Sequence, residues 1–228
     1  MPKSAKHRIQ KVIPHFQQRL IAEQNDAKSL IYSKDLTIIT GKAGSGKTLV
    51  AVYSALTMLL EGKVNRIIIT RPPVEAGEGM GFLPGGLEEK MDPWLAPIYE
   101  NLELIIKKDN TQYLVEEGKI DIRPIAMMRG QTYTKCAIIV DEAQNVTHNQ
   151  MELIVGRLGR DSKMMICGDA RQKDLNYRSR SGLPFLIQKA TKLHEVAHIE
   201  LQANHRHDLV DKLLNLYLEE DENKSKKA

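Results

Sequence analysis

The sequence predicts an α/β protein with a mainly parallel sheet that carries helices on both faces. Short apolar runs rich in β-branched residues alternate along the chain with longer stretches of helical character. Most of the short runs contain a continuous apolar stretch, which is typical of parallel strands buried on both faces. Alternation of this kind favours a sheet whose strands are connected through helices.

The individual elements follow from the same pattern. Strands are expected at 36–40, 66–70, 119–126, 136–141, 163–169 and 198–201. Helices are expected at 47–60, 94–107, 109–117, 147–157, 183–192 and 206–218. The long irregular segment RPPVEAGEGMGFLPGG (71–86) directly follows an expected strand, at the end where open α/β sheets bind ligands.

Composition limits the classes of protein to consider. The 228 residues have a net charge of +4 and a pI near 8.9, which permits nucleic acid binding without requiring it. No apolar run approaches the ~20 residues that cross a bilayer, and the basic N-terminus lacks the apolar segment of a secretory signal. We therefore expect a cytoplasmic protein without a membrane partner. Cys136 and Cys167 are expected to be buried, reduced thiols.

The domain organisation is expected to be simple. An N-terminal segment covers residues 1–34, one folded domain covers 35–218, and a solvated tail rich in acidic and basic residues covers 219–228. The N-terminal segment is expected to contribute to the base end of a nucleotide site.

The stretch GKAGSGKT fits the pattern G-x-x-x-x-G-K-[ST] between an expected strand and an expected helix. Glycines let such a loop wrap around an anion with its backbone N–H groups pointing inward, and the helix N-terminus adds partial positive charge. The lysine of the pattern reaches the β- and γ-phosphates, and the hydroxyl binds Mg²⁺. The expected nucleotide-binding residues are Gly41, Lys42, Ala43, Gly44, Ser45, Gly46, Lys47 and Thr48.

A nucleoside triphosphate site also needs an acid at the end of a neighbouring buried strand, and AIIVDEAQ supplies two. Asp141 can hold Mg²⁺, and Glu142 can polarise an attacking water, which favours hydrolysis. In MMICGDARQKD, Gln172 follows another strand and could contact the γ-phosphate or the attacking water. The pattern thus predicts an ATPase that uses ATP and Mg²⁺.

Together these motifs resemble the PhoH family of P-loop ATPases. The resemblance covers about residues 35–217 and rests on GKAGSGKT, TRPPVEAGEGMGFLPGGLEEKMDPWLAPIYE, IAMMRGQTY, IIVDEAQN, SKMMICGD, SGL and NHRHDLV. It implies a RecA-like core similar to the ATPase half of superfamily-one helicases, with a link to RNA metabolism. It also implies ATP binding at 41–48, metal and water activation at Asp141 and Glu142, and γ-phosphate sensing at Gln172.

Further roles follow from the resemblance. Arg206 in HRHDLV falls where the family has an Arg-His pair, and it is the candidate arginine finger. Gln17 or Gln18 in PHFQQRL is the candidate reader of the adenine edge, as an upstream Gln is in related helicases. Superfamily-one helicases close the ATP site between two RecA-like domains, whereas this sequence shows one. We therefore expect a ring-like homo-oligomer, a hexamer, with ATP at its subunit interfaces.

Several residues are candidates for nucleic acid contact. Arg71 follows a strand at a position that touches the nucleic acid backbone in helicase relatives, and Arg129 adds positive charge. Tyr133 lies among basic residues, where it could stack on a base or pack half-buried. The sequence thus favours an ATPase, a possible helicase, acting on RNA or single-stranded DNA. The alternative is a nucleotide-dependent switch or assembly factor without unwinding, and a small-molecule phosphotransferase is disfavoured because the acidic pair suits water.

One stretch favours a different chemistry. HEVAH (194–198) fits the zinc-protease pattern H-E-x-x-H, in which two histidines on one helix face hold Zn²⁺ and Glu195 acts as the base. The overlapping VAHIEL has the alternation and β-branching typical of a strand, which would orient the histidines differently. We therefore expect His194 and His198 to be unrelated to zinc.

Overall fold

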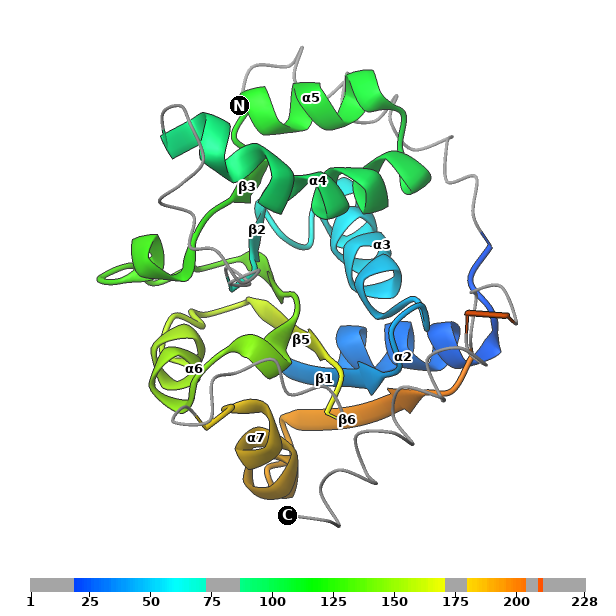
Figure 1. Cartoon of the computed structure of the whole chain (residues 1–228), viewed down its shortest axis with the longest axis vertical. Coiled ribbons are helices and arrows are strands. Elements are labelled where there is room, and N and C mark those ends of the chain that lie inside the picture. Colours follow the sequence, from blue (N-terminus) through cyan, green and yellow to red (C-terminus); the bar gives the residue numbers. More distant parts are fainter. Residues whose placement is uncertain (1–18, 73–86, 171–179, 204–208, 211–228) are drawn as a thin grey trace.

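The computed structural model describes residues 19–72, 87–170, 180–203 and 209–210, with backbone alone for 87–94. In this part of the chain, six parallel strands form one sheet in the order β3-β2-β4-β5-β1-β6 (Figure 1). The strands are β1 (Leu36–Gly41), β2 (Arg66–Thr70), β3 (Ile120–Ile122), β4 (Cys136–Val140), β5 (Lys163–Gly168) and β6 (Val196–Leu201). The parallel α/β prediction is confirmed.

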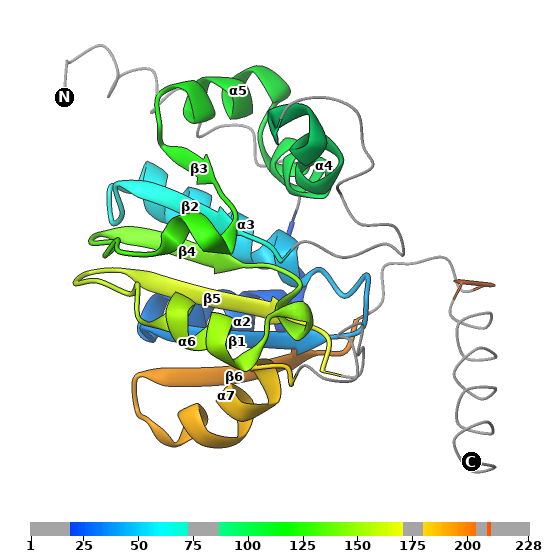
Figure 2. The same cartoon turned by 60° about the vertical axis from the view of Figure 1, so that its left-hand side comes forward.

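Helices cover both faces of this sheet, as predicted (Figure 2). The α-helices are α2 (Ala22–Ser33), α3 (Lys47–Leu60), α4 (Leu87–Ile105), α5 (Lys108–Glu116), α6 (His148–Val155) and α7 (Leu183–Lys189). Short 3₁₀ turns are η3 (Ile125–Met128), η4 (Ala143–Asn145) and η5 (Ala190–Lys192). Successive strand residues point to opposite faces, so Ile39 packs in the core beneath α2 to α5, whereas Ile38 packs in the core beneath α6 and α7.

The sheet order decides which chain segments meet at the carboxyl ends of the strands. β5 pairs with both β1 and β4, and β4 also pairs with β2. The loop after β1 and the residues after β4 therefore lie two strands apart at the same edge. The expectation that the 163–169 strand lies beside the 136–141 strand is confirmed.

The clearest differences from expectation are one shortened strand and one helix that was not expected. The strand expected at 119–126 ends at Ile122, and η3 follows Pro124, whose ring removes a backbone donor from the ladder. The helix α2 was not expected, because Gln24, Ala27 and Ile31 are its only buried residues. α2 packs on α3, β1 and β6, so its stability comes from tertiary contacts more than from its own sequence.

The carboxylate of Glu23 on α2 accepts hydrogen bonds from the N–H groups of Gln202 (2.9 Å) and Ala203 (2.7 Å). These two residues directly follow β6. α2 thus connects the chain before β1 to the chain after β6.

The HEVAH stretch runs into β6, which confirms the expected strand. His198 Nε2 lies 2.8 Å from Thr40 Oγ1 on the neighbouring strand β1. Within the described ranges, no group of three or more His, Cys, Asp or Glu side chains is placed to hold a metal ion. Cys136 and Cys167 are buried and free, as predicted. None of the described helices is both long and apolar enough to cross a membrane.

Candidate functional site

The loop between β1 and α3 has the backbone conformation of an anion cradle. Gly41, Gly44 and Gly46 have φ values of 149°, 86° and 82°, which residues with a side chain rarely adopt. Gly46 directly precedes Lys47, the first residue of α3, so the helix N-terminus faces the loop.

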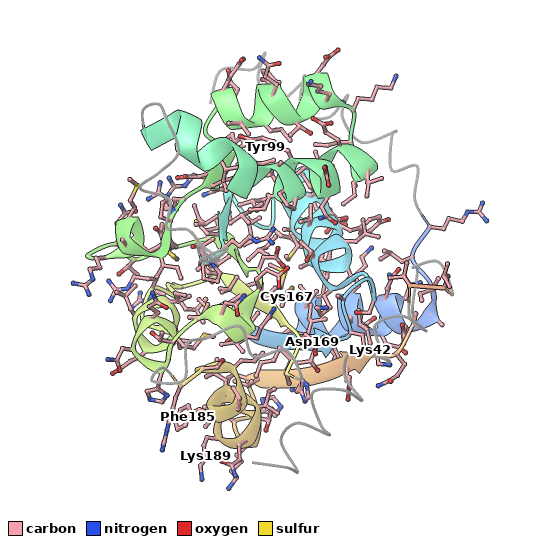
Figure 3. The ribbon with its side chains drawn as sticks, viewed as in Figure 1. Lys42, Tyr99, Cys167, Asp169, Phe185 and Lys189 are labelled. Carbon is pink, nitrogen blue, oxygen red and sulfur yellow. The ribbon has the colours of Figure 1, made fainter. Side chains whose placement is uncertain are left out.

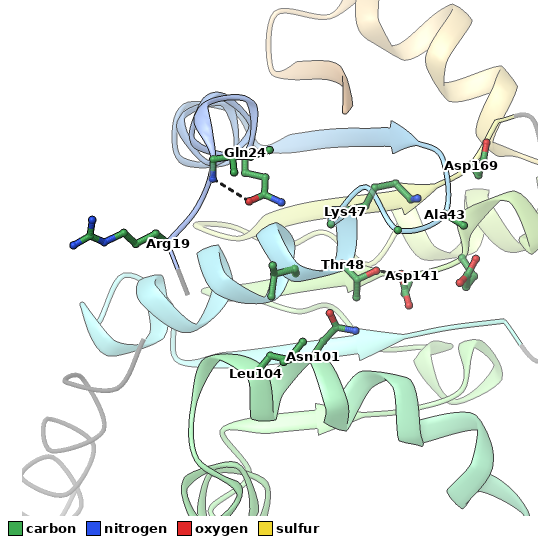
Figure 4. Close-up of a pocket in the computed structure, with 14 residues that line it drawn as sticks. Arg19, Gln24, Ala43, Lys47, Thr48, Asn101, Leu104, Asp141 and Asp169 are labelled. Carbon is green, nitrogen blue, oxygen red and sulfur yellow. Dashed lines mark hydrogen bonds between the residues drawn. The ribbon is translucent and has the colours of Figure 1, made fainter. Parts of the chain in front are cut away.

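The side chains of Lys47 and Thr48, at the start of α3, are both held by hydrogen bonds. Lys47 Nζ donates hydrogen bonds to the carbonyl oxygens of Gly41 (2.8 Å) and Lys42 (2.9 Å). Thr48 Oγ1 donates to Asp141 Oδ1 at 2.7 Å, across 93 positions of sequence. The structure therefore brings together the phosphate-loop hydroxyl and the acid that the sequence paired for a metal ion (Figure 4).

Asp141 directly follows β4 and is only 5% exposed. Burial raises the pKa of Asp141, the hydrogen bond from Thr48 lowers it, the charge of Glu142 raises it, and Arg71 lowers it; the net direction is upward. The oxygens of Thr48 and Asp141 form the hard, oxygen-only donor set that Mg²⁺ prefers. These residues therefore fit Mg²⁺.

Glu142 has a left-handed backbone, with φ 49° and ψ 43°. This conformation is uncommon for a residue other than glycine, and at functional sites it is held in place by surrounding contacts. Gln144, which the sequence analysis did not single out, supplies one of them: its Nε2 donates to Glu142 Oε2 at 2.6 Å. Gln144 Oε1 also accepts from the N–H of Asp169 at 3.0 Å, so this buried amide joins the ends of β4 and β5.

Arg71 directly follows β2 and turns toward the acidic pair. Its Nη2 lies 3.4 Å from Glu142 Oε1 and its Nη1 lies 3.9 Å from Asp141 Oδ2, and the side chain is 15% exposed. The contact with a nucleic acid backbone that the sequence analysis expected of Arg71 stays a prediction. The β2–β4 pairing, which the motifs alone do not reveal, brings Arg71 to the acids.

Of the two roles considered for Tyr133, stacking on a base and packing, the structure favours packing. The side chain of Tyr133 is 1% exposed and belongs to the core beneath α6 and α7, so its ring offers no face to a base. The backbone beside it is also fixed, because the N–H of Tyr133 donates to the carbonyl oxygen of Arg157 at 2.9 Å. Arg129, which follows η3, is exposed. Gln17, Gln18, Gln172 and Arg206 lie outside the described residues.

A pocket of about 420 Å³ encloses the site (Figure 4). Its polar part is lined by Ala43, Gly44, Gly46, Lys47, Thr48, Asp141, Glu142 and Asp169. Its remaining lining comes from Arg19, Ile21 and Gln24 at the start of α2, Leu49 on α3, and Asn101 and Leu104 on α4. The remaining lining thus mixes apolar side chains (Ile21, Leu49, Leu104) with polar ones (Arg19, Gln24, Asn101), which suits the flat, hydrogen-bonding organic group of a ligand whose phosphate tail lies in the polar part.

The buried residue Cys167, on the central strand β5, packs beneath the start of α3. Figure 3 shows Cys167 and Asp169 near the middle of the molecule, with Phe185 and Lys189 apart from them on α7. Cys167 Sγ lies 3.7 Å from the carbonyl oxygen of Lys47, so β5 supports the first turn of α3 from below. Burial raises the pKa of this thiol, and the charge of Asp141 adds to the effect.

The sequence is similar to proteins of one known family. Residues 18–218 match the family described as PhoH-like protein. The PhoH-like protein of Bacillus subtilis (strain 168) is 43% identical over 196 residues, which are 85% of this chain and 61% of that protein. The PhoH-like protein of Synechocystis sp. is 44% identical over 200 residues, which are 87% of this chain and 61% of that protein. The chain thus spans about three-fifths of the length of these relatives.

A solved structure agrees with the fold. The UvsW helicase from bacteriophage T4 superposes with a TM-score of 0.51 at 11% identity, over 88% of this chain and 68% of that chain. At this identity the likeness shows the fold alone, and the shared fold is RecA-like. The chain therefore belongs to the PhoH family and has the core of a P-loop NTPase.

Proposed function

We propose that the protein binds ATP with Mg²⁺ and hydrolyses it, and that hydrolysis is coupled to RNA or single-stranded DNA. The observation that carries the proposal is the 2.7 Å hydrogen bond from Thr48 to Asp141. It joins a glycine-rich anion loop to a buried acid two strands away, which is the arrangement that magnesium-dependent phosphoryl transfer needs.

Each group has a separate task in this proposal. The backbone N–H groups of residues 41–46 and the N-terminus of α3 bind the phosphates, and Lys47 exchanges its two loop carbonyls for phosphate oxygens. Thr48 and Asp141 hold Mg²⁺, which when bound neutralises phosphate charge. Glu142 orients the attacking water and accepts its proton.

The other expected residues complete the proposed site. Gln17 or Gln18 reads the adenine edge, a role supported by Arg19, the next described residue, which lines the pocket. Gln172 senses the γ-phosphate, and Arg206 of a neighbouring copy acts as the arginine finger in a ring-like hexamer. The exposed Arg129 contributes to the nucleic acid surface.

Two substitutions test the chemistry. In the variant Glu142→Gln, calorimetry should find ATP bound as in the original protein, whereas hydrolysis should slow by about 10²–10⁴-fold, because only proton transfer is lost. Lys47→Ala should abolish tight binding. Glu152→Gln, on the exposed surface of α6, is the matched control for a lost carboxylate and should hydrolyse normally. Absence of any binding heat with ATP and magnesium in the unsubstituted protein would reject the proposal.

Single-stranded RNA separates the two classes of function. An ATPase that works on nucleic acid should hydrolyse ATP faster when single-stranded RNA or DNA is added at low salt. A flat rate across both nucleic acids would favour the alternative, a nucleotide-dependent switch or assembly factor.

A further inference from the structure

We propose that Arg71 is a positioning residue that holds Asp141 and Glu142 in a fixed relation to each other. The proposal rests on the hydrolytic role proposed above for the acidic pair. It gives Arg71 a role inside the site, in place of the expected contact with a nucleic acid backbone.

The four carboxylate oxygens of the acidic pair each face a different donor atom, from three side chains. Asp141 Oδ1 accepts from Thr48 at 2.7 Å, and Glu142 Oε2 accepts from Gln144 at 2.6 Å. The other two oxygens face the two terminal nitrogens of Arg71, at 3.9 Å for Asp141 Oδ2 and 3.4 Å for Glu142 Oε1. The guanidinium therefore bridges two carboxylates that neighbour each other in sequence.

A guanidinium suits this bridge better than an ammonium does. Its nitrogens form a rigid planar fork, so one side chain can face two separate carboxylates at once. An ammonium is a compact point charge, and it would have to favour one of the two acids. The distances are longer than in a tight bidentate pair, which agrees with a fork shared between partners.

The acidic pair needs a neighbouring cation because its side chains are withdrawn from water. The side chain of Asp141 is 7% exposed and that of Glu142 is 35% exposed, so their mutual repulsion is only partly screened. Lys47 directs its ammonium to the carbonyls of Gly41 and Lys42. Arg71 is thus the cation that, among the described residues, forms ion pairs with both acids.

The pairing of β2 with β4 fixes the position of the Arg71 backbone relative to that of Asp141. Thr70 pairs with Val140 in the parallel β2–β4 register, and the N–H of Asp141 donates to the carbonyl oxygen of Thr70 at 2.9 Å. Arg71 and Asp141 therefore leave neighbouring strands at the same level. The buried Nε of Arg71 has no hydrogen-bond partner, so the contacts of the guanidinium with the acids are made by its two terminal nitrogens.

The left-handed backbone of Glu142 makes this support necessary. A residue in that conformation carries strain and keeps it only when its surroundings hold it. Gln144 holds one carboxylate oxygen from the side of β5, and Arg71 holds the other from the side of β2. With Arg71 lost, the carboxylate is free to leave the position from which it would orient a water.

A double-substitution cycle on thermal unfolding tests the bridge without reference to activity. The variants are Arg71→Gln, Glu142→Gln and the two combined. Arg71→Gln should lower Tm by about 5 °C or more, because it leaves two poorly screened carboxylates side by side. In the Glu142→Gln background the same change should cost clearly less, because one of the charges is already absent. Equal losses in both backgrounds would overturn the proposal.

Kinetics then test the positioning role. Arg71→Gln should lower kcat by about 10²-fold while the dissociation constant for ATP hardly changes, because the groups that hold the phosphates are untouched. Arg71→Lys should restore part of the lost Tm but little of kcat, since a single ammonium cannot span both acids. Arg160→Gln, an exposed arginine outside the pocket lining, is the matched control and should change neither quantity.

The outcomes separate this proposal from the function on which it rests. If the unsubstituted protein hydrolyses no ATP, the proposed function fails, whereas the unfolding cycle still decides whether the bridge exists. If Arg71→Gln leaves kcat and Tm unchanged and weakens only RNA binding, Arg71 is a nucleic acid contact and the positioning role is wrong. If Arg71→Gln does not fold, the cycle is run with Arg71→Lys, for which the same inequality is expected.

Discussion

Gly41 offers a test of how the neighbouring strand shapes the phosphate loop. A Cβ added at this position would lie 2.5 Å from the carbonyl oxygen of Leu201 and 2.7 Å from Ser45 Oγ. Leu201 is also the partner of Gly41 in the β1–β6 register, so the backbone oxygen cannot move without disturbing the sheet. The φ of Gly41, 149°, adds a conformational penalty for any side chain.

The expected cost of Gly41→Ala has two parts. The unfavourable backbone conformation costs about 1–3 kcal/mol, and forcing a methyl group against fixed atoms costs about 1–3 kcal/mol more. At about 2–4 °C per kcal/mol for a protein of this size, Tm should fall by roughly 4–24 °C. Gly62→Ala is the matched control, because Gly62 also has a positive φ, 73°, but a Cβ there meets no atom within 4 Å. Gly62→Ala should carry the conformational cost alone, about 1–2 kcal/mol.

Thermal unfolding of both variants, followed by calorimetric titration with ATP, checks the reasoning. Gly41→Ala should lose more Tm than Gly62→Ala and should also bind ATP more weakly, because its methyl group displaces the loop. Gly62→Ala should bind ATP normally. Equal Tm losses, or undiminished ATP affinity in Gly41→Ala, would show that the approach of Leu201 does not shape the loop.

Two further predictions concern pH and assembly. Burial lowers the pKa of His198 below its ordinary 6.5, although the charge of Glu200 acts in the opposite direction. As the pH falls below 6.5, His198 therefore takes up a proton more readily in the unfolded state than in the folded state, and the free energy of unfolding decreases. The loss of Tm between about pH 7.5 and about pH 5.5 should therefore be smaller in His198→Gln than in the original protein, and an equal or larger loss would contradict this. For the expected hexamer, mixing Arg206→Ala with Lys47→Ala should recover hydrolysis that neither variant has alone, because an intact arginine then meets an intact phosphate loop. A mixture as inactive as its components, or a protein that sediments as an active monomer, would count against action between subunits.

Most of the sheet could be predicted from the sequence, because its central strands are buried on both faces and each contains a continuous apolar stretch. Those strands matched to within about a residue, which is better than boundaries usually allow. The expected 119–126 strand failed where Pro124 interrupts it. The helix α2 was missed because it buries few residues and owes its position to contacts with distant elements.

Some residues of the candidate site could be predicted from the sequence, and others could not. The loop and the acids were predictable because each motif is local and its chemistry fixes the residue types. The roles of Arg71 and Gln144 were not, since their contacts depend on β2 and β5 lying on either side of β4. The sequence left two roles open for Tyr133, because basic residues surround it, and only the tertiary packing of its side chain in the core decides between them.

The attachment of α2 has a practical consequence for anyone who shortens the protein. A truncated version that starts at Leu36, where the sheet begins, would lack Ile21 and Gln24 from the pocket wall. It would also leave the N–H groups of Gln202 and Ala203 without the carboxylate of Glu23. Such a fragment would keep every residue of the 41–48 loop and yet lose the contact that ties one wall of the pocket to the chain after β6.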